Sequence, residues 1–303
     1  MNITLRQVEV FLHTASLGSL SQAAARLCLT QAAASMALKG FETQLGEKLF
    51  DRAGRRLILN ENGRAAIPLA SEIIGRALEL EGCFRNEEEL SGELVIGASS
   101  TIGNYVLPGR VADFLELNPL TRIRLEVGNT EAIIGQVLRF KVDVGFIEGH
   151  CTEPEIAVLP FMNDELVIFA AAGHRLAGRR QVDRRELEKV DWILREKGSG
   201  TREIFEQQIN ALSLNLRVRL ELGHTEAIKN AVARGRGISC LSRWALEDLA
   251  RLGRIAFLNT PFLNLERKFY LILHRHKYRT TILNQFIGHL KTSLADHPAK
   301  ITS

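Results

Sequence analysis

Two copies of one short pattern constrain the fold of this 303-residue chain more than any other sequence feature. The stretch V-G-N-T-E-A-I at 127–133 returns as L-G-H-T-E-A-I at 222–228. Each copy follows an alternating stretch typical of a strand and opens a stretch with helical periodicity. Chance is one explanation, and a duplicated strand-to-helix turn is the other. In the second case, Thr130 and Thr225 are placed to cap the two helices, and each is followed by an acid that suits the helix dipole.

The sequence around both copies alternates between strand and helix patterns. The predicted strands of the first set are 93–98, 122–127 and 142–147, and those of the second set are 165–171, 192–194, 217–222 and 237–241. Strands separated by helical segments predict βαβ units and a parallel sheet. We therefore expect an α/β fold overall, with two similar lobes that use the same turn.

The first 60 residues have a different organisation. Thr4, Ser19 and Thr30 each precede a helical stretch, and Ser19 with Gln22 makes a capping-box pattern. The second helix is short and rich in alanine, so it can approach the third helix closely, as in a helix-turn-helix. The stretch A-G-R-R-L-I-L-N then predicts a turn and a short strand, which would form a wing. The alternative is a small helical packing unit with a solvated basic loop.

The chemistry of this segment matches duplex DNA. In a helix-turn-helix, the N-terminal part of the second helix enters the major groove. There Gln pairs with adenine, Ala or Met contacts thymine methyl groups, and Arg on the wing meets phosphates or the minor groove. The predicted DNA-contacting residues are Ser21, Thr30, Gln31, Ala32, Ser35, Met36, Lys39, Arg52, Arg55 and Arg56.

The stretch S-L-S-Q-A-A-A-R-L-C-L-T-Q-A-A-A-S-M-A-L-K-G-F-E-T-Q-L-G-E-K-L-F-D-R resembles the winged helix-turn-helix of LysR-type transcriptional regulators. It matches the family pattern at Ala24, Ala25, Thr30, Gln31, Ala33, Ser35, Glu42, Leu45, Gly46, Leu49, Phe50 and Arg52. It departs at Ala32, where Pro or Ser is usual, and at Leu38 and Phe41, where Ile and Leu are usual. The departure at Ala32 concerns base reading rather than the fold.

The resemblance implies a chain of three parts. These are an all-α winged helix-turn-helix over 1–60, a linker and dimerisation helix over 61–90, and an effector-binding domain over 91–303 that resembles type 2 periplasmic binding proteins. In that domain, lobe one would comprise 91–162 and 268–303, and lobe two would comprise 163–267.

The segment from 61 to 90 carries its own helical signal. Apolar residues recur at helical spacing at Ile67, Ala70, Ile73, Ile74, Ala77, Leu80 and Phe84. Pro68 is expected to kink this helix near its start. An apolar stripe on a long helix needs a partner, which is either the same domain or a second copy of the chain. The resemblance implies the second copy.

Three polar turns follow predicted strands and open predicted helices. In α/β sheets, ligands lie at the carboxyl ends of strands, and helix N-termini suit anions. The predicted effector-binding residues are Ser99, Ser100, Thr101, Asn129, Thr130, Gly198, Ser199, Gly200, Thr201 and Arg202. The alternative is that their hydroxyls only cap helices, the role we also expect at His224 and Thr225. The turns resemble those of the family's sulfur-assimilation regulators, and this resemblance implies a small anion such as sulfite, sulfate or a carboxylate between the lobes.

Composition excludes several other classes of protein. The four cysteines have no C-x-x-C spacing, so the sequence predicts neither a disulfide framework nor a metal site, and no cofactor motif is found. No apolar stretch predicts a transmembrane helix or a signal peptide, so we expect a cytoplasmic protein. The net charge of +4 permits an anionic partner.

The expected partners follow from the resemblance. They are double-stranded DNA with a partly palindromic site, a small anionic effector, and further copies of the chain in a homodimer or homotetramer; RNA polymerase is a further candidate. A solute-binding protein of a transporter is one rival, against which the missing signal peptide and the helix-turn-helix argue. An enzyme that uses the interlobe cleft is the other, and the turns supply hydroxyls and amides without an obvious base.

Overall fold

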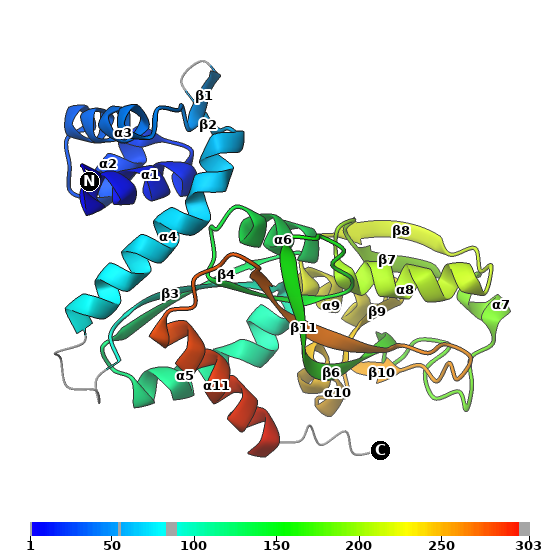
Figure 1. Ribbon diagram of the computed structural model, residues 1–303. Coiled ribbons are helices and arrows are strands. Elements are labelled where there is room, and N and C mark those ends of the chain that lie inside the picture. Colours follow the sequence, from blue (N-terminus) through cyan, green and yellow to red (C-terminus); the bar gives the residue numbers. More distant parts are fainter. Residues whose placement is uncertain (1, 54–55, 83–89, 297–303) are drawn as a thin grey trace.

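The computed structural model of the chain describes residues 2–53, 56–82 and 90–296 (Figure 1). Its N-terminal module contains α1 (Leu5–Leu17), α2 (Leu20–Arg26), α3 (Gln31–Leu45) and an antiparallel wing of β1 (Phe50–Ala53) and β2 (Arg56–Leu59). The predicted caps set the helix starts, because the hydroxyls of Thr4, Ser19 and Thr30 each accept a hydrogen bond from the backbone N–H three residues on. The winged helix-turn-helix is confirmed.

Aromatic residues hold the module together. The ring of Phe11 packs against those of Phe41 and Phe50, with centroids 5.5 and 5.8 Å apart. Ala24 and Ala34 are buried where α2 meets α3, so the two helices approach closely as the alanine-rich sequence predicted. This core fixes α3 while its opposite face stays in solvent.

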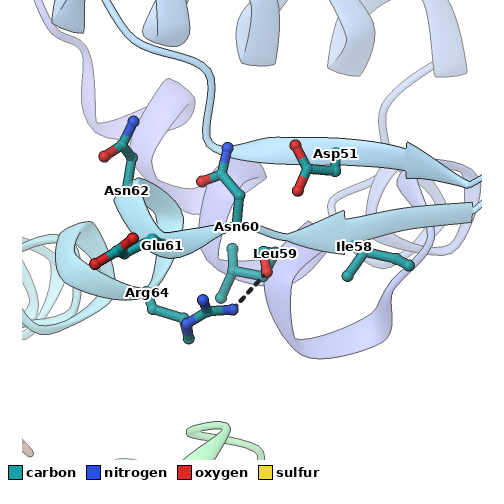
Figure 2. Close-up of a pocket in the computed structure, with 7 residues that line it drawn as sticks. All are labelled: Asp51, Ile58, Leu59, Asn60, Glu61, Asn62 and Arg64. Atoms are coloured by element: carbon teal, nitrogen blue, oxygen red, sulfur yellow. Dashed lines mark hydrogen bonds between the residues drawn. The ribbon is translucent and has the colours of Figure 1, made fainter.

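The linker helix α4 (Glu61–Gly82) begins directly after the wing (Figure 2). The Asn60 side chain accepts a hydrogen bond from the Gly63 N–H, and Arg64 Nη1 donates to the Leu59 carbonyl at 2.9 Å. The helix continues through Pro68. Residues of the wing and of the start of α4 line a shallow hollow at this junction. The hydrogen bonds there join the wing to the helix.

The apolar stripe predicted for this helix divides into two faces. Ile67 and Ala70 are buried against the N-terminal module. Ile73 of the stripe, by contrast, leaves 46% of its surface exposed, and Leu69, which was not part of the predicted stripe, leaves 66% exposed. Phe84, predicted as part of the stripe, lies outside the described residues, as does the rest of 83–89.

Lobe one of the C-terminal domain is built on a parallel sheet. Its elements are β3 (Gly92–Ser99), η1 (Ile102–Val106), α5 (Leu107–Leu117), β4 (Thr121–Gly128), α6 (Thr130–Leu138), β5 (Val144–Glu148) and α11 (Thr281–Asp296). Strand β3 lies between β4 and β5 and is parallel to both. Helix α11 returns from the end of the chain to pack beside α5 (Figure 1), where the rings of Phe114 and Phe286 are 5.2 Å apart.

Lobe two has elements that include the same strand–helix alternation as lobe one, from β7 to β9. They are α7 (Arg184–Leu187), β7 (Asp191–Arg195), α8 (Gly200–Ala211), β8 (Arg217–Leu222), α9 (Thr225–Ala233), β9 (Ser239–Ser242), η2 (Arg243–Ala245), α10 (Glu247–Arg251) and β10 (Ile255–Phe257). Strands β7 and β8 are parallel, and a parallel bridge joins Trp192 to Ile238 just before β9. Trp192 is fully buried and packs on Phe205 of α8. The α/β class with a two-lobe C-terminal domain is confirmed, and the residue bounds of the lobes stay a prediction.

Two long antiparallel strands, β6 (Ile156–Ala171) and β11 (Glu266–His274), run through both lobes. The sheet order is β10-β6-β11-β5-β3-β4, and β9 pairs with β6 as well. At one end β11 pairs with β5 of lobe one, and at the other β6 pairs with β9 and β10 of lobe two. The lobes are therefore joined by two strands, which lie side by side in Figure 1.

Candidate interlobe site and nucleic-acid interface

The predicted DNA-reading residues of α3 lie on one outward face. Gln31, Ala32, Ser35, Met36 and Lys39 are all exposed, whereas the core-packing residues Ala34, Leu38 and Phe41 recur at helical spacing on the opposite face. Met36 keeps 75% of its surface in solvent, which is unusual for a large apolar side chain. An exposed apolar group between polar ones suits the major groove, where it contacts thymine methyls.

The other predicted DNA contacts divide into two groups. Ser21 is exposed on α2, and the Thr30 hydroxyl caps α3 by accepting from the Ala33 N–H at 3.1 Å. Arg55 lies outside the described residues, and so do the side chains of Arg52 and Arg56.

A buried carboxylate occupies the centre of the interlobe contact. Glu148, the last residue of β5, is only 1% exposed. Its carboxylate accepts hydrogen bonds from Ser99 at the end of β3, from Thr101 Oγ1 at 3.2 Å, and from Thr201 Oγ1 of α8 at 3.5 Å. Three predicted effector residues from both lobes thus converge on one acid that the sequence analysis did not identify.

A buried ion pair completes this cluster. Arg267 of β11 donates to Thr201 Oγ1 at 3.0 Å, to Thr101 Oγ1 at 3.4 Å and to the Asp164 carboxylate at 2.6 Å. Ser242 donates to the other Asp164 oxygen at 2.7 Å. Burial raises the pKa of Asp164, although the positive charge of Arg267 opposes that shift. We call Ser99, Thr101, Glu148, Thr201 and Arg267 the hydroxyl cluster.

A second polar cluster lies beside the first. Arg195, the last residue of β7, is 2% exposed and donates to Ser100 Oγ at 3.2 Å and to Thr225 Oγ1 at 3.4 Å. It also forms an ion pair with Glu196. Burial works against ionisation of Glu196, but the bonds and charge of Arg195, with a further bond from Asn129, outweigh it and hold the pKa of Glu196 below its usual value.

The two lobes touch through backbone as well as side chains. Between the lobes, the Glu131 N–H donates to the Gly198 carbonyl at 3.2 Å; within lobe one, Thr130 Oγ1 donates to the Glu148 carbonyl at 2.7 Å. Gly198 has φ of +81°, a conformation that favours glycine. A side chain at Gly200 would meet the backbone of Glu148, so glycine permits this close approach.

The remaining predicted site residues have different surroundings. Ser199 is 2% exposed, and no hydrogen-bond partner for its Oγ exists in the described part of the chain. Arg202 forms ion pairs with Glu206 and Glu221 and donates to the Arg195 carbonyl, so its guanidinium is not part of the hydroxyl cluster.

The structure corrects two sequence-based expectations. Asn129, not Thr130, caps α6, and no side chain caps α9 at His224, so the predicted threonine caps were wrong. Both threonines instead make buried hydrogen bonds. Thr130 donates to the Glu148 carbonyl, and Thr225 accepts from Arg195. The stretch after Ser99 is also not an open turn, because helical structure begins at Ser100.

Sequence reasoning missed four charged residues of the site, namely Glu148, Asp164, Arg195 and Arg267. Two of them carried a usable signal. Glu148 directly follows the buried stretch V-G-F-I, and Arg195 directly follows W-I-L, so each is a charge at the carboxyl end of a predicted strand.

These features together define a winged helix-turn-helix DNA-binding protein with a two-lobe ligand-binding domain. Residues 5–64 match the family described as bacterial regulatory helix-turn-helix protein, lysR family, and residues 87–295 match the LysR substrate binding domain. The chain belongs to the LysR family of transcriptional regulators. No described helix has the length and apolar character needed to span a membrane.

Related proteins and structures agree with this membership. The chain is 44% identical over 289 residues to the uncharacterized HTH-type transcriptional regulator YeiE of Escherichia coli K12, covering 95% of this chain and 97% of that protein. It is 30% identical to the HTH-type transcriptional regulator CysL of Bacillus subtilis over 287 residues, covering 94% and 96% of the two chains.

Two solved structures show the same fold. Full-length OxyR of Pseudomonas aeruginosa superposes with a TM-score of 0.76 at 19% identity and covers 97% of this chain and 95% of its own. The regulatory domain of CcmR from Synechocystis, solved in complex with 2-PG, has a TM-score of 0.64 at 30% identity and covers 67% of this chain and 97% of its own.

Proposed function

We propose that the chain is a regulator whose binding or bending of DNA is controlled by a small oxyanion held between the lobes. The observation that carries this proposal is the hydroxyl cluster. Ser99, Thr101 and Thr201 donate three hydroxyl bonds to the two oxygens of one carboxylate, and the Arg267 guanidinium donates to two of these hydroxyls. Hydroxyls and a guanidinium are strong partners for an anion with several oxygens.

In this structure the anion at those donors is the carboxylate of Glu148. Two negative charges in one buried site repel strongly, so an oxyanion effector must displace the Glu148 carboxylate from these donors. The unpartnered hydroxyl of Ser199 offers a further donor at the start of α8. Effector and Glu148 therefore compete for the same donors.

The effector class is a sulfur oxyanion such as sulfite or sulfate, with a small carboxylate as the alternative. The small size of the cluster, closed by Gly200 and Glu148, favours a ligand of few atoms. The similarity to the CcmR domain solved with 2-PG supports a ligand in the regulatory domain. The lobes bind this ligand without converting it, in keeping with a family of transcriptional regulators.

The DNA-reading end is proposed to work as a symmetric pair. Leu69 and Ile73 expose an apolar face on α4, which a second copy of the helix would cover. Two heads joined in this way read a partly palindromic site through Gln31, Met36 and Lys39 of each α3. We propose a homotetramer that bends the DNA between two such sites in the cytoplasm, with RNA polymerase as the downstream partner.

A thermal-shift series tests the effector site. The full-length protein is heated with sulfite, sulfate, thiosulfate, nitrate, phosphate and acetate at constant ionic strength. A bound ligand at 100 times its Kd stabilises the folded state by about 2.7 kcal/mol. We expect one oxyanion to raise Tm, Thr101→Ala to abolish the rise, and Glu148→Gln to enlarge it by removing the competing charge.

Thr121→Ala is the matched control. Thr121 is also buried, at 6% exposure, but it is the first residue of β4 and so lies away from the carboxyl ends of the strands. Its hydroxyl donates to the Leu90 carbonyl. Its variant should keep the ligand-induced shift of the wild type. Absence of a shift with every anion, or a shift that survives Thr101→Ala, would refute the site.

A further inference from the structure

One tyrosine of the effector domain makes several contacts with the linker helix α4. The ring of Tyr278 contacts Gly75 of α4 through its Cδ1 and Cε1 atoms, and an added Cβ at Gly75 would come within 2.6 Å of Cε1. The Tyr278 hydroxyl donates to Glu79 Oε2 at 2.6 Å, and the guanidinium of Arg76 lies 5.0 Å from the ring centroid. One side chain thus uses a hydrogen bond, a cation–π contact and a close backbone approach on a single helical turn.

Neighbouring contacts fix the segment that carries this tyrosine. Lys277 Nζ pairs with Asp143 at 2.6 Å, and the other Asp143 oxygen accepts from the Val95 N–H in β3. The ring of His274 packs against that of Phe140 in a tilted arrangement, with ring centroids 4.2 Å apart. Phe140 in turn packs against the core of the N-terminal module. The segment is therefore held to lobe one on one side and to the DNA-reading part on the other.

The segment that carries Tyr278 follows strand β11, which contributes Arg267 to the proposed effector site. Strand β11 carries Arg267 of the hydroxyl cluster near one end and His274 at the other, and Tyr278 follows four residues later. Strand β11 also pairs with β5 so that Phe269 stands opposite Glu148. The two charged members of the hydroxyl cluster thus belong to neighbouring strands, and one of those strands leads to the linker helix.

We propose that Tyr278 seated on Gly75 is a latch that makes the direction of α4 follow the state of the hydroxyl cluster. A rearrangement of Glu148 and Arg267 shifts strands β5 and β11. The shift of β11 then moves Tyr278 relative to Gly75. The direction of α4 then sets the placement of the DNA-reading heads. This inference rests on the effector-controlled function proposed above, but its test needs no effector.

Hydrogen exchange of the full-length protein distinguishes loss of the latch from the usual effect of alanine on helix stability. Replacing a mid-helix glycine with alanine normally stabilises the helix. Gly75→Ala should do the opposite, because the new Cβ displaces the Tyr278 ring from its bond to Glu79. We expect exchange of amides in 71–82 to become about tenfold faster, while peptides of α1 and α3 keep their wild-type rates.

Gly288→Ala is the matched control, since a Cβ there meets nothing within 4 Å in the middle of α11. It should leave exchange in α4 unchanged and slow exchange in its own helix. Tyr278→Phe keeps the ring and removes only the bond to Glu79, so it should give a smaller acceleration in 71–82 without loss of folding.

DNA bending supplies the second readout. A duplex selected in vitro by the wild-type protein is labelled at both ends, and energy transfer between the labels reports the bend. Gly75→Ala and Tyr278→Phe should both change the bend at saturating protein, and Gly288→Ala should not. If Gly75→Ala slows exchange in α4, or leaves both exchange and bend at wild-type values, the latch is refuted, whatever the effector screen shows.

Discussion

Substitution of Gly200 by alanine should force the two lobes apart. Gly200 is the first residue of α8 and lies against the end of β5. An added Cβ would come within 2.6 Å of the Glu148 carbonyl carbon, closer still to its oxygen, and within 2.8 Å of Thr130 Oγ1. The neighbours are backbone and a buried hydroxyl, so no flexible side chain can move aside.

The size of the effect follows from these distances. Ordinary contact of a Cβ begins at 3.4 Å, so the Glu148 carbonyl carbon must move away by about 0.8 Å and its oxygen by more. Overpacking of this kind costs about 1–3 kcal/mol. Because the Glu148 carbonyl also accepts from Thr130, the shift disturbs that bond as well. For a domain of this size, each kcal/mol lowers Tm by about 2–4 °C.

Calorimetry of Gly200→Ala, beside Gly223→Ala, measures this cost. A Cβ at Gly223 meets nothing within 4 Å, so that variant should keep the wild-type Tm or raise it slightly. Small-angle scattering should report a more open effector domain for Gly200→Ala alone. A wild-type Tm and wild-type scattering for Gly200→Ala would refute the close interlobe packing.

Three further predictions concern caps, pH and DNA. Asn129→Ala should destabilise the effector domain by about 0.5–2 kcal/mol in urea unfolding, because the Asn129 side chain caps α6; an unchanged midpoint would contradict that cap. Burial lowers the pKa of His274, so its stabilising contribution is present above the unfolded pKa of about 6.5 and is lost as the pH falls below it. Tm should therefore fall less in His274→Gln than in wild type between pH 7.5 and 5.5, and equal slopes would argue against it. Gln31→Ala should relax base preference in a selection experiment, whereas Lys39→Ala should weaken all duplexes alike and reduce the salt dependence of binding; the reverse pattern would show that α3 is seated differently.

Local signals explain what the sequence could predict. A hydroxyl before a helical stretch marks a helix start because its bond partner is three residues away, and this was sufficient for Thr4, Ser19 and Thr30. The alternation of strands and helices likewise set both lobes. The resemblance to the family then supplied the order of the parts.

The errors came from competition by distant groups. Thr130 does not cap α6, because the buried Glu148 carbonyl needs a donor and Asn129 is free to cap instead. Strand β6 was predicted only from residue 165, but the structure extends it back to Ile156, because residues 156–160 pair with the remote strand β11.

The candidate site could be predicted only in part for the same reason. Its hydroxyls stand in turns that the sequence marks, but their charged partners are remote. Thr101 and Arg267 are 166 positions apart, and Ser99 and Glu148 are 49 apart. Such pairs form only when two strands and two lobes come together, so a local sequence pattern cannot predict them.

The dissociation constant for DNA, measured with and without the bound effector, tests the central claim most directly. The full-length protein is titrated onto an in vitro-selected duplex at constant ionic strength, with the anion that gives the largest thermal shift at saturation or with chloride in its place. We predict a change in Kd of about fivefold or more, the size of ordinary allosteric coupling, and its loss in Thr101→Ala. An unchanged Kd while the thermal shift shows the anion bound would contradict control of DNA binding from the interlobe site.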